Sequence, residues 1–263
     1  MGTVGLLTVQ IAGVVLLVLL LWVLGRRRVG FAWSSLGWGA LAFPLSQVAR
    51  LALTIPLNLL LSTVLSPTTA VAATTAVMLA TSGLFEESTR WIVMRYWAKR
   101  VRTWEEGVGF GLGHGGIEAL LLLGIAAINN FILALNPDML KAQVEAVGDP
   151  EAVTALDQQL TALNELSLAF VAMSWYERLL AIALHVALSV LIMRGVRERR
   201  WQLWLIAVVA HIAFNSLVLL KEPLGHAGMY AVLTVPALIA VWAVAAGPLS
   251  RRADAVRAGT EVR

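Results

Sequence analysis

The chain contains no cysteine, and only 14% of its residues are charged. The missing thiols exclude disulfides, iron–sulfur clusters, thiolate zinc sites and cysteine nucleophiles. A soluble domain carries about 25% charged residues, whereas 59% of this chain is hydrophobic and its mean hydropathy is +0.79. One soluble core of this size cannot hide so much apolar surface, so we expect a membrane protein.

Long apolar stretches predict an all-α, polytopic transmembrane bundle, because a helix crosses a bilayer with about 20 apolar residues. The first stretch has no basic region before it and is followed by Arg26, Arg27 and Arg28, so we interpret it as a retained span rather than a signal peptide. We expect one multi-pass domain over residues 1–263 in the plasma membrane. About seven spans are predicted: 4–24, 37–64, 70–97, 107–134, 168–194, 202–221 and 227–248.

The basic residues predict the orientation of these spans. In a seven-span bundle, 15 lysines and arginines fall on one side and two, Lys141 and Lys221, on the other. Because positive loops stay in the cytoplasm, we expect the N-terminus outside and the C-terminus inside. The loop 135–167 is then extracytoplasmic, and its pattern predicts two short amphipathic helices. The net charge of +4 lies in short runs between spans, so it does not indicate a nucleic-acid partner.

The third span contains ionisable residues at bilayer depth, where such groups are costly and mark functional sites. Glu86 and Glu87 lie four and three residues before Arg90, so either carboxylate can meet the guanidinium on one helix face. A single ion pair would need only one glutamate. Two adjacent carboxylates therefore favour a function beyond neutralisation of Arg90.

Glycines surround His114 in the fourth span, at positions 111, 113, 115 and 116. Each glycine costs a helix about 1 kcal/mol relative to alanine, but in membranes it allows two helices to approach closely. Glu118 lies one turn after His114. A core histidine held by one hydrogen bond is the alternative interpretation.

Further polar residues lie in the last spans: His185 in the fifth, and His211 with Asn215 one turn apart in the sixth. With a rise of 1.5 Å per residue, Glu87, His114, His185 and His211 all lie roughly 11–15 Å from the cytoplasmic ends of their helices. We therefore expect one polar cluster that faces the cytoplasmic leaflet. Arg50 is also inside a span, and its partner is left open between Glu118 and a carboxylate of the cluster.

Taken together, these motifs resemble the YhfC family of intramembrane proteases, which is related to the type II CAAX prenyl endopeptidases and to PrsW-type proteases. The matching residues span about 80–220: Glu86, Glu87, Arg90, His114, Glu118, His185, His211 and Asn215. The CAAX enzymes usually have the spacing EExxxR, whereas this chain has EExxR. The difference favours the YhfC or PrsW branch and argues against prenylated substrates.

The resemblance implies a glutamic-type endopeptidase that cuts a peptide or membrane protein near the cytoplasmic membrane face. Glu86 or Glu87 with His114 would activate water, and His211 with Asn215 would stabilise the oxyanion. Arg90, Glu118 and His185 would support the site. We expect no obligatory cofactor, although zinc is possible, with His114, His185 and His211 as candidate ligands.

Two other functions remain open. Intramembrane carboxylates and histidines also serve as proton or ion paths in transporters, and a noncatalytic membrane scaffold could retain the same residues. The predicted residues form a layer rather than a ladder across the bilayer, which favours the protease.

Overall fold

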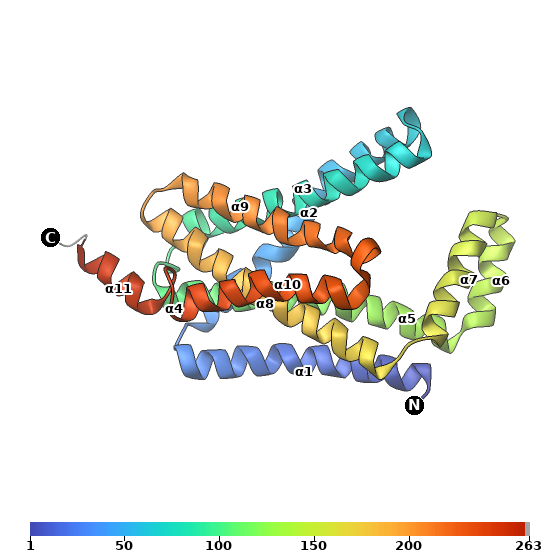
Figure 1. Cartoon of the computed structure of the whole chain (residues 1–263), viewed down its shortest axis with the longest axis horizontal. Helices are drawn as coiled ribbons and strands as arrows, with labels where there is room; N and C mark the ends of the chain where they lie inside the picture. Colours follow the sequence, from blue (N-terminus) through green and yellow to red (C-terminus); the bar gives the residue numbers. More distant parts are fainter. Residues whose placement is uncertain (261–263) are drawn as a thin grey trace. The chain divides into compact units, whose positions relative to one another are not determined.

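The computed structural model describes residues 1–260, and those residues form helices, turns and loops without a strand. Arg263, one of the 15 basic residues counted above, lies outside them. The α-helices, drawn in Figure 1, are α1 (Thr3–Val29), α2 (Trp33–Val64), α3 (Pro67–Ile92), α4 (Trp104–Ala119), α5 (Ile125–Leu135), α6 (Pro137–Val147), α7 (Pro150–Asn164), α8 (Leu168–Arg197), α9 (Trp201–Ser216), α10 (Lys221–Ala245) and α11 (Arg251–Thr260). Two π-helical turns, η1 (Val93–Trp97) and η2 (Leu120–Gly124), extend α3 and α4, and a 3-10 turn, η3 (Leu217–Leu220), follows α9.

Six helical segments of the described chain are long and apolar enough to cross a membrane. These segments are Thr3–Val29, Trp33–Val64, Pro67–Trp97, Trp104–Leu135, Leu168–Arg197 and Trp201–Ala245. The chain is therefore an all-α, multi-pass membrane protein, as the sequence predicts.

The predicted spans 202–221 and 227–248 both correspond to the last segment, Trp201–Ala245. Its helical geometry is interrupted at Gly225, where φ is +66°, and α9 and α10 run in opposite directions (Figure 1). The number of spans and their orientation stay predictions. Helix α2 continues through Pro44 and Pro56, so neither proline breaks it.

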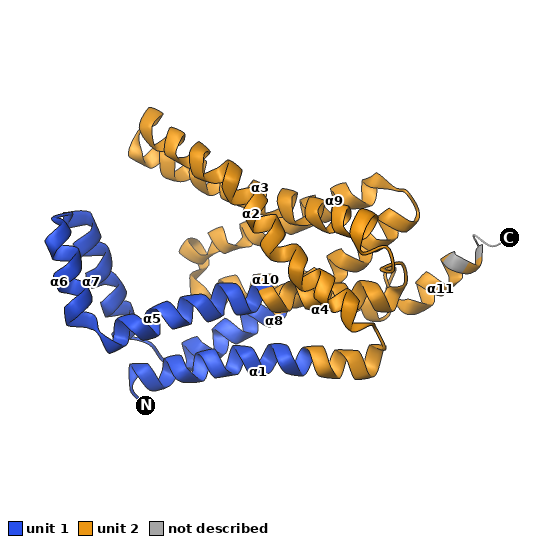
Figure 2. Cartoon of the chain, turned by 180° about the vertical axis from the view of Figure 1, so that it is seen from behind, with its two compact units in different colours: residues 1–21, 118–179 blue, residues 22–117, 180–263 orange. Residues whose placement is uncertain are grey.

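The chain divides into two compact units, residues 1–21 with 118–179 (unit 1) and residues 22–117 with 180–263 (unit 2) (Figure 2). The interpretation as a single membrane domain stays a prediction. In unit 1, the loop 135–167 forms helices α6 and α7, which confirms the predicted pair of short helices. The Asp149 carboxylate caps α7 by accepting the N–H groups of Glu151 and Ala152.

Glycines in unit 2 bring helix backbones into contact, as predicted for the fourth span. A Cβ on Gly39 of α2 would overlap the carbonyl of Phe110 on α4, and one on Gly113 of α4 would overlap the carbonyl of Leu36 on α2. Gly111 faces the backbone of α8 in the same way. Helix α4 is thus held against both α2 and α8 at the level of His114.

Candidate active site

The centre of unit 2 is a buried ion pair on α3. Arg90 and Glu87 have no exposed surface, and Glu86 is 4% exposed. Arg90 Nη1 lies 3.0 Å from Glu87 Oε1, while Arg90 Nη2 lies 3.9 Å from Glu86 Oε2. Glu87 is therefore the main counter-charge of Arg90, and Glu86 is only loosely held by it.

Each glutamate meets a histidine from another helix. His211 on α9 places Nδ1 2.7 Å from Glu87 Oε1, and His114 on α4 places Nε2 3.1 Å from Glu86 Oε2. Both histidines are buried. The two adjacent carboxylates consequently have different principal partners.

His185 on α8 lies between these two histidines, with ring centroids 5.1 Å from His114 and 5.2 Å from His211. Its Nδ1 lies 2.6 Å from Nη2 of Arg90. Because a guanidinium only donates hydrogen bonds, Nδ1 must accept, and the proton of the neutral ring is then on Nε2. While Arg90 holds it, His185 has no lone pair left for a metal ion.

Helix α2 contributes a residue that the sequence interpretation missed. Gln47 donates to Glu86 Oε1 at 3.2 Å and accepts from Arg50 Nη1 at 3.1 Å. Arg50 also donates to Thr81 and to the carbonyl of Met78, so its principal contacts are these neutral groups. An amide one turn before an intramembrane arginine was the available signal in the sequence.

Asn215 has a partner on α3 outside this cluster. Asn215 donates from Nδ2 to Ser82 Oγ at 2.9 Å, and so connects α9 to α3 one turn before Glu86. Glu118 lies at the end of α4 in unit 1, where Arg178 approaches it to 3.4 Å. The structure thus brings together Glu86, Glu87, Arg90, His114, His185 and His211 in unit 2.

The donor atoms of this cluster fit a divalent metal ion. Ligand atoms lie about 2.0–2.2 Å from zinc, so two ligands of one ion are roughly 3–4 Å apart. Glu86 Oε2 is 3.1 Å from His114 Nε2 and 3.9 Å from His211 Nε2. One ligand atom each of Glu86, His114 and His185 also lies within 4.8 Å of the others. His211 is a better third ligand than His185. Glu87 accepts the Nδ1 proton of His211, which leaves Nε2 unprotonated and able to bind a metal.

These features define a multi-pass membrane protein with a buried glutamate–histidine centre. The chain belongs to the YhfC intramembrane metalloprotease family, whose model matches residues 13–240. The uncharacterized membrane protein YhfC of Bacillus subtilis (strain 168) is 34% identical over 171 residues. The match covers 62% of this chain and 63% of that protein, so it spans less than two thirds of the relative's length. No solved structure matches the chain significantly.

Proposed function

We propose that the chain is an intramembrane endopeptidase in which Glu86, beside His114, activates the water that attacks a peptide bond. The observation that carries the proposal is the 3.1 Å approach of Glu86 Oε2 to His114 Nε2 in a buried site. A carboxylate within hydrogen-bond reach of a water is a suitable general base. Membership of a protease family supports the same reaction class.

Glu86 is favoured over Glu87 as the base by their hydrogen bonds. Glu87 Oε1 accepts from His211, and Arg90 contacts both Glu87 oxygens, at 3.0 and 3.2 Å. Glu87 therefore has little capacity left to accept a proton and serves to orient His211. Glu86 Oε1 is held by Gln47, which leaves Oε2 directed at the histidines.

In a metal-bound form Glu86 would be a ligand rather than the base: Glu86 Oε2, His114 Nε2 and His211 Nε2 would hold the divalent metal. When bound, it would act as a Lewis acid that lowers the pKa of water and polarises the peptide carbonyl. Glu87 would fix the ring of His211 through Nδ1, and Arg90 would hold both Glu87 and His185.

Asn215 supplies the donor for the developing oxyanion in this proposal. An amide has two N–H groups, of which one is used by Ser82. Asn215 lies one turn after His211 and is half-buried. His211 itself could donate from Nε2 only as the imidazolium, because its Nδ1 already serves Glu87. A fixed donor in a dry site stabilises an oxyanion strongly.

Glu86→Gln tests the proposed function, with Glu105→Gln as the matched control. Glu105 is on the same unit, away from the cluster, and pairs with Arg251. Both variants are reconstituted in liposomes with a panel of model transmembrane peptides, and products are identified by mass spectrometry. Loss of a general base lowers the rate by about 10²–10⁴-fold, so cleavage should nearly vanish in Glu86→Gln only.

The metal content of the same samples tests the ligand set. Metal bound to the wild type should be lost in His114→Ala and His211→Ala, and retained in Glu105→Gln. Full cleavage by Glu86→Gln contradicts the proposal. A proton flux across liposomes that hold the wild type, lost in Glu86→Gln, with no cleavage by either protein, would also contradict the proposal, because it would assign the site to transport.

A further inference from the structure

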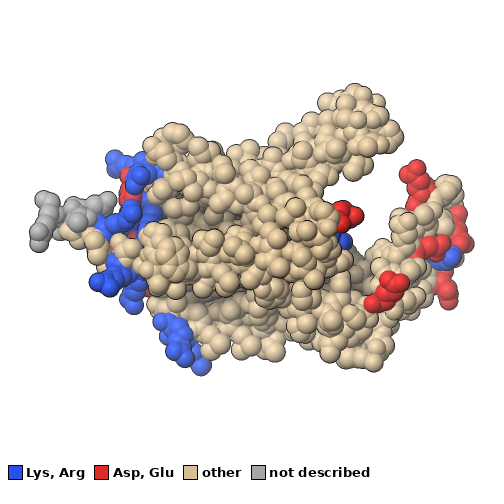
Figure 3. All heavy atoms as spheres, in the orientation of Figure 1, with Lys and Arg blue, Asp and Glu red and all other residues tan. Residues whose placement is uncertain are grey.

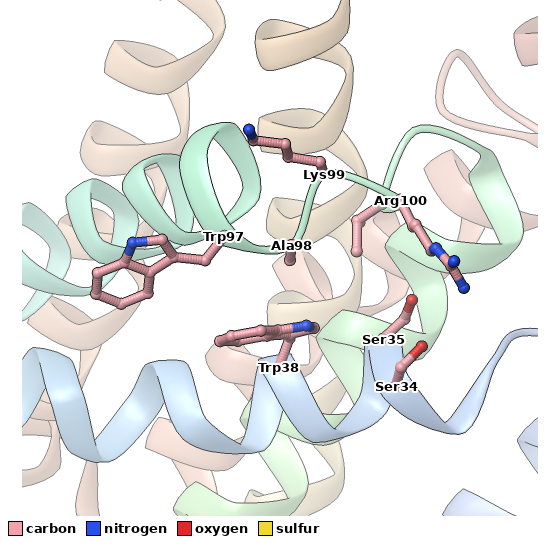
Figure 4. A pocket seen from close by; sticks show the side chains of 8 residues that line it. Ser34, Ser35, Trp38, Trp97, Ala98, Lys99 and Arg100 are labelled. Carbon is pink, nitrogen blue, oxygen red and sulfur yellow. The ribbon is translucent and has the colours of Figure 1, made fainter.

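A pocket of about 360 Å³ lies in unit 2 between the start of α2 and the α3–α4 loop, and Figure 4 shows the residues that line it. Two tryptophans form its apolar wall: Trp38 of α2 and Trp97 at the end of η1, with ring centroids 6.5 Å apart. Lys99 and Arg100 of the α3–α4 loop line it as well, together with the hydroxyl residues Ser34 and Ser35 in the first turn of α2. The pocket therefore combines an aromatic wall with two cations.

The two cations have no acidic partner within residues 1–260. Other basic residues at this end are paired: Arg251 with Glu105, and Arg197 and Arg200 with Glu198. No ion pair of the described chain includes Lys99 or Arg100, and both side chains are exposed.

Glu106, the acidic residue nearest the start of α2, is already engaged. Its carboxylate accepts the hydroxyl of Ser35 and the N–H of Ala32. Glu106 therefore pairs with neither Lys99 nor Arg100, and the pocket carries two cations beside one carboxylate that neutral groups hold.

A second pocket adjoins the first and shares Lys99. Its other lining residues are Arg95, Tyr96, Arg102, Val196 and Arg199. Burial and the neighbouring charge of Arg95 lower the pKa of Arg102, so Arg95 and Arg102 repel each other. A bound anion would relieve that repulsion.

The position of the pocket selects the kind of anion. Lysine and arginine side chains gather at this end of unit 2 (Figure 3), next to the ends of the candidate spans Trp33–Val64 and Pro67–Trp97. Tryptophan rings at span ends sit at the level of lipid headgroups, and clusters of basic residues there attract anionic lipids. Trp97 is 53% exposed, so an acyl chain can lie along it.

We infer that Lys99 and Arg100, with the wall of Trp38 and Trp97, bind the phosphate of an anionic phospholipid headgroup. The lipid rests its glycerol and upper chain on the indole rings while the two cations contact the phosphate. The site is separate from the glutamate–histidine cluster, and its occupancy does not depend on the proposed proteolysis.

Lipid binding to the purified full-length chain tests the inference. Native mass spectrometry in detergent gives the affinity for phosphatidylglycerol, with zwitterionic phosphatidylcholine as the reference lipid. Each cation near an anionic surface strengthens binding roughly fivefold, so Lys99→Gln with Arg100→Gln should weaken phosphatidylglycerol binding about 30-fold. The charge-matched control is Arg27→Gln with Arg28→Gln, two exposed residues at the end of α1, and it should weaken binding less than threefold.

Further experiments distinguish a bound phospholipid from other negatively charged ligands. Trp38→Leu with Trp97→Leu should lower the preference for the lipid while leaving Lys99 and Arg100 in place. Equal weakening by the pocket and control variants would overturn the inference, because it would indicate diffuse attraction. Displacement of the lipid by millimolar inorganic phosphate, or tighter binding of an acidic peptide than of phosphatidylglycerol, would overturn it as well. Circular dichroism confirms that each variant is folded.

Discussion

Replacing Glu87 by glutamine should destabilise the protein much more than replacing Glu86, although the two side chains are adjacent and chemically identical. Glu87 has no exposed surface and lies 3.0 Å from the equally buried Arg90. Glu86 lies 3.9 Å from the same guanidinium. The first substitution leaves a buried cation without its main counter-charge, whereas the second removes a looser contact.

The expected magnitudes follow from these contacts. Removing one partner of a buried ion pair costs about 3–5 kcal/mol. Arg90 keeps His185 and Glu86 as neighbours, so we expect the lower end of that range, about 3 kcal/mol, for Glu87→Gln. Glu86→Gln should cost about 1 kcal/mol, the value of one hydrogen bond. The difference of about 2 kcal/mol is roughly a 30-fold change in the unfolding equilibrium.

Unfolding of the purified variants in mixed detergent micelles, followed by circular dichroism, measures this difference. Arg90→Lys is a useful companion, because an ammonium cannot reproduce the planar fork that bonds Glu87 and His185 together. Stabilities of Glu87→Gln and Glu86→Gln that agree within about 0.5 kcal/mol, the usual range for neutral substitutions, would refute the assignment of Glu87 as the counter-charge.

Two further predictions concern packing and pH. Gly113→Ala should lower the midpoint of thermal unfolding, because its Cβ meets a carbonyl of α2 and overpacking costs about 1–3 kcal/mol. Gly37→Ala, with nothing within 4 Å of its Cβ, should raise the midpoint. The opposite order would contradict the close approach of α4 to α2. The pH prediction concerns Asp254. Burial alone would raise the pKa of Asp254, but hydrogen bonds and charges of Arg197 and Arg194 hold it below its usual value. The ionised Asp254 therefore stabilises the fold above about pH 4. Asp254→Asn should lower the free energy of unfolding by about 1 kcal/mol at neutral pH, and this difference from the wild type should disappear as the pH falls below that value. A difference that persists in acid would contradict the prediction.

Composition and periodicity were enough to predict the membrane class and the helical loop, because both depend on local sequence alone. The polar cluster was predictable for a related reason. A buried charge in a span needs partners, and residues at a similar depth on different helices are the ones able to supply them. His114, His185 and His211 indeed converge on Glu86, Glu87 and Arg90.

The partner of each side chain within the cluster could not be predicted. Helical spacing allows Arg90 to meet either glutamate, and only the packing of α9 against α3 decides that Glu87 serves both Arg90 and His211. Gln47 was missed because one amide, even one turn before Arg50, is a weak signal in an apolar helix. The tautomer of His185 likewise depends on a contact between residues 95 positions apart, which no local motif encodes.

The nearly complete burial of Glu86 and the three histidines has a kinetic consequence. None of these side chains is more than 4% exposed, so an extended peptide cannot reach them until neighbouring helices separate. Opening motions of this kind take microseconds to milliseconds or longer, and in many enzymes they limit turnover. Under the proposed function, substrates would be discriminated by how readily a peptide enters the site rather than by the chemistry of the bond that is cut.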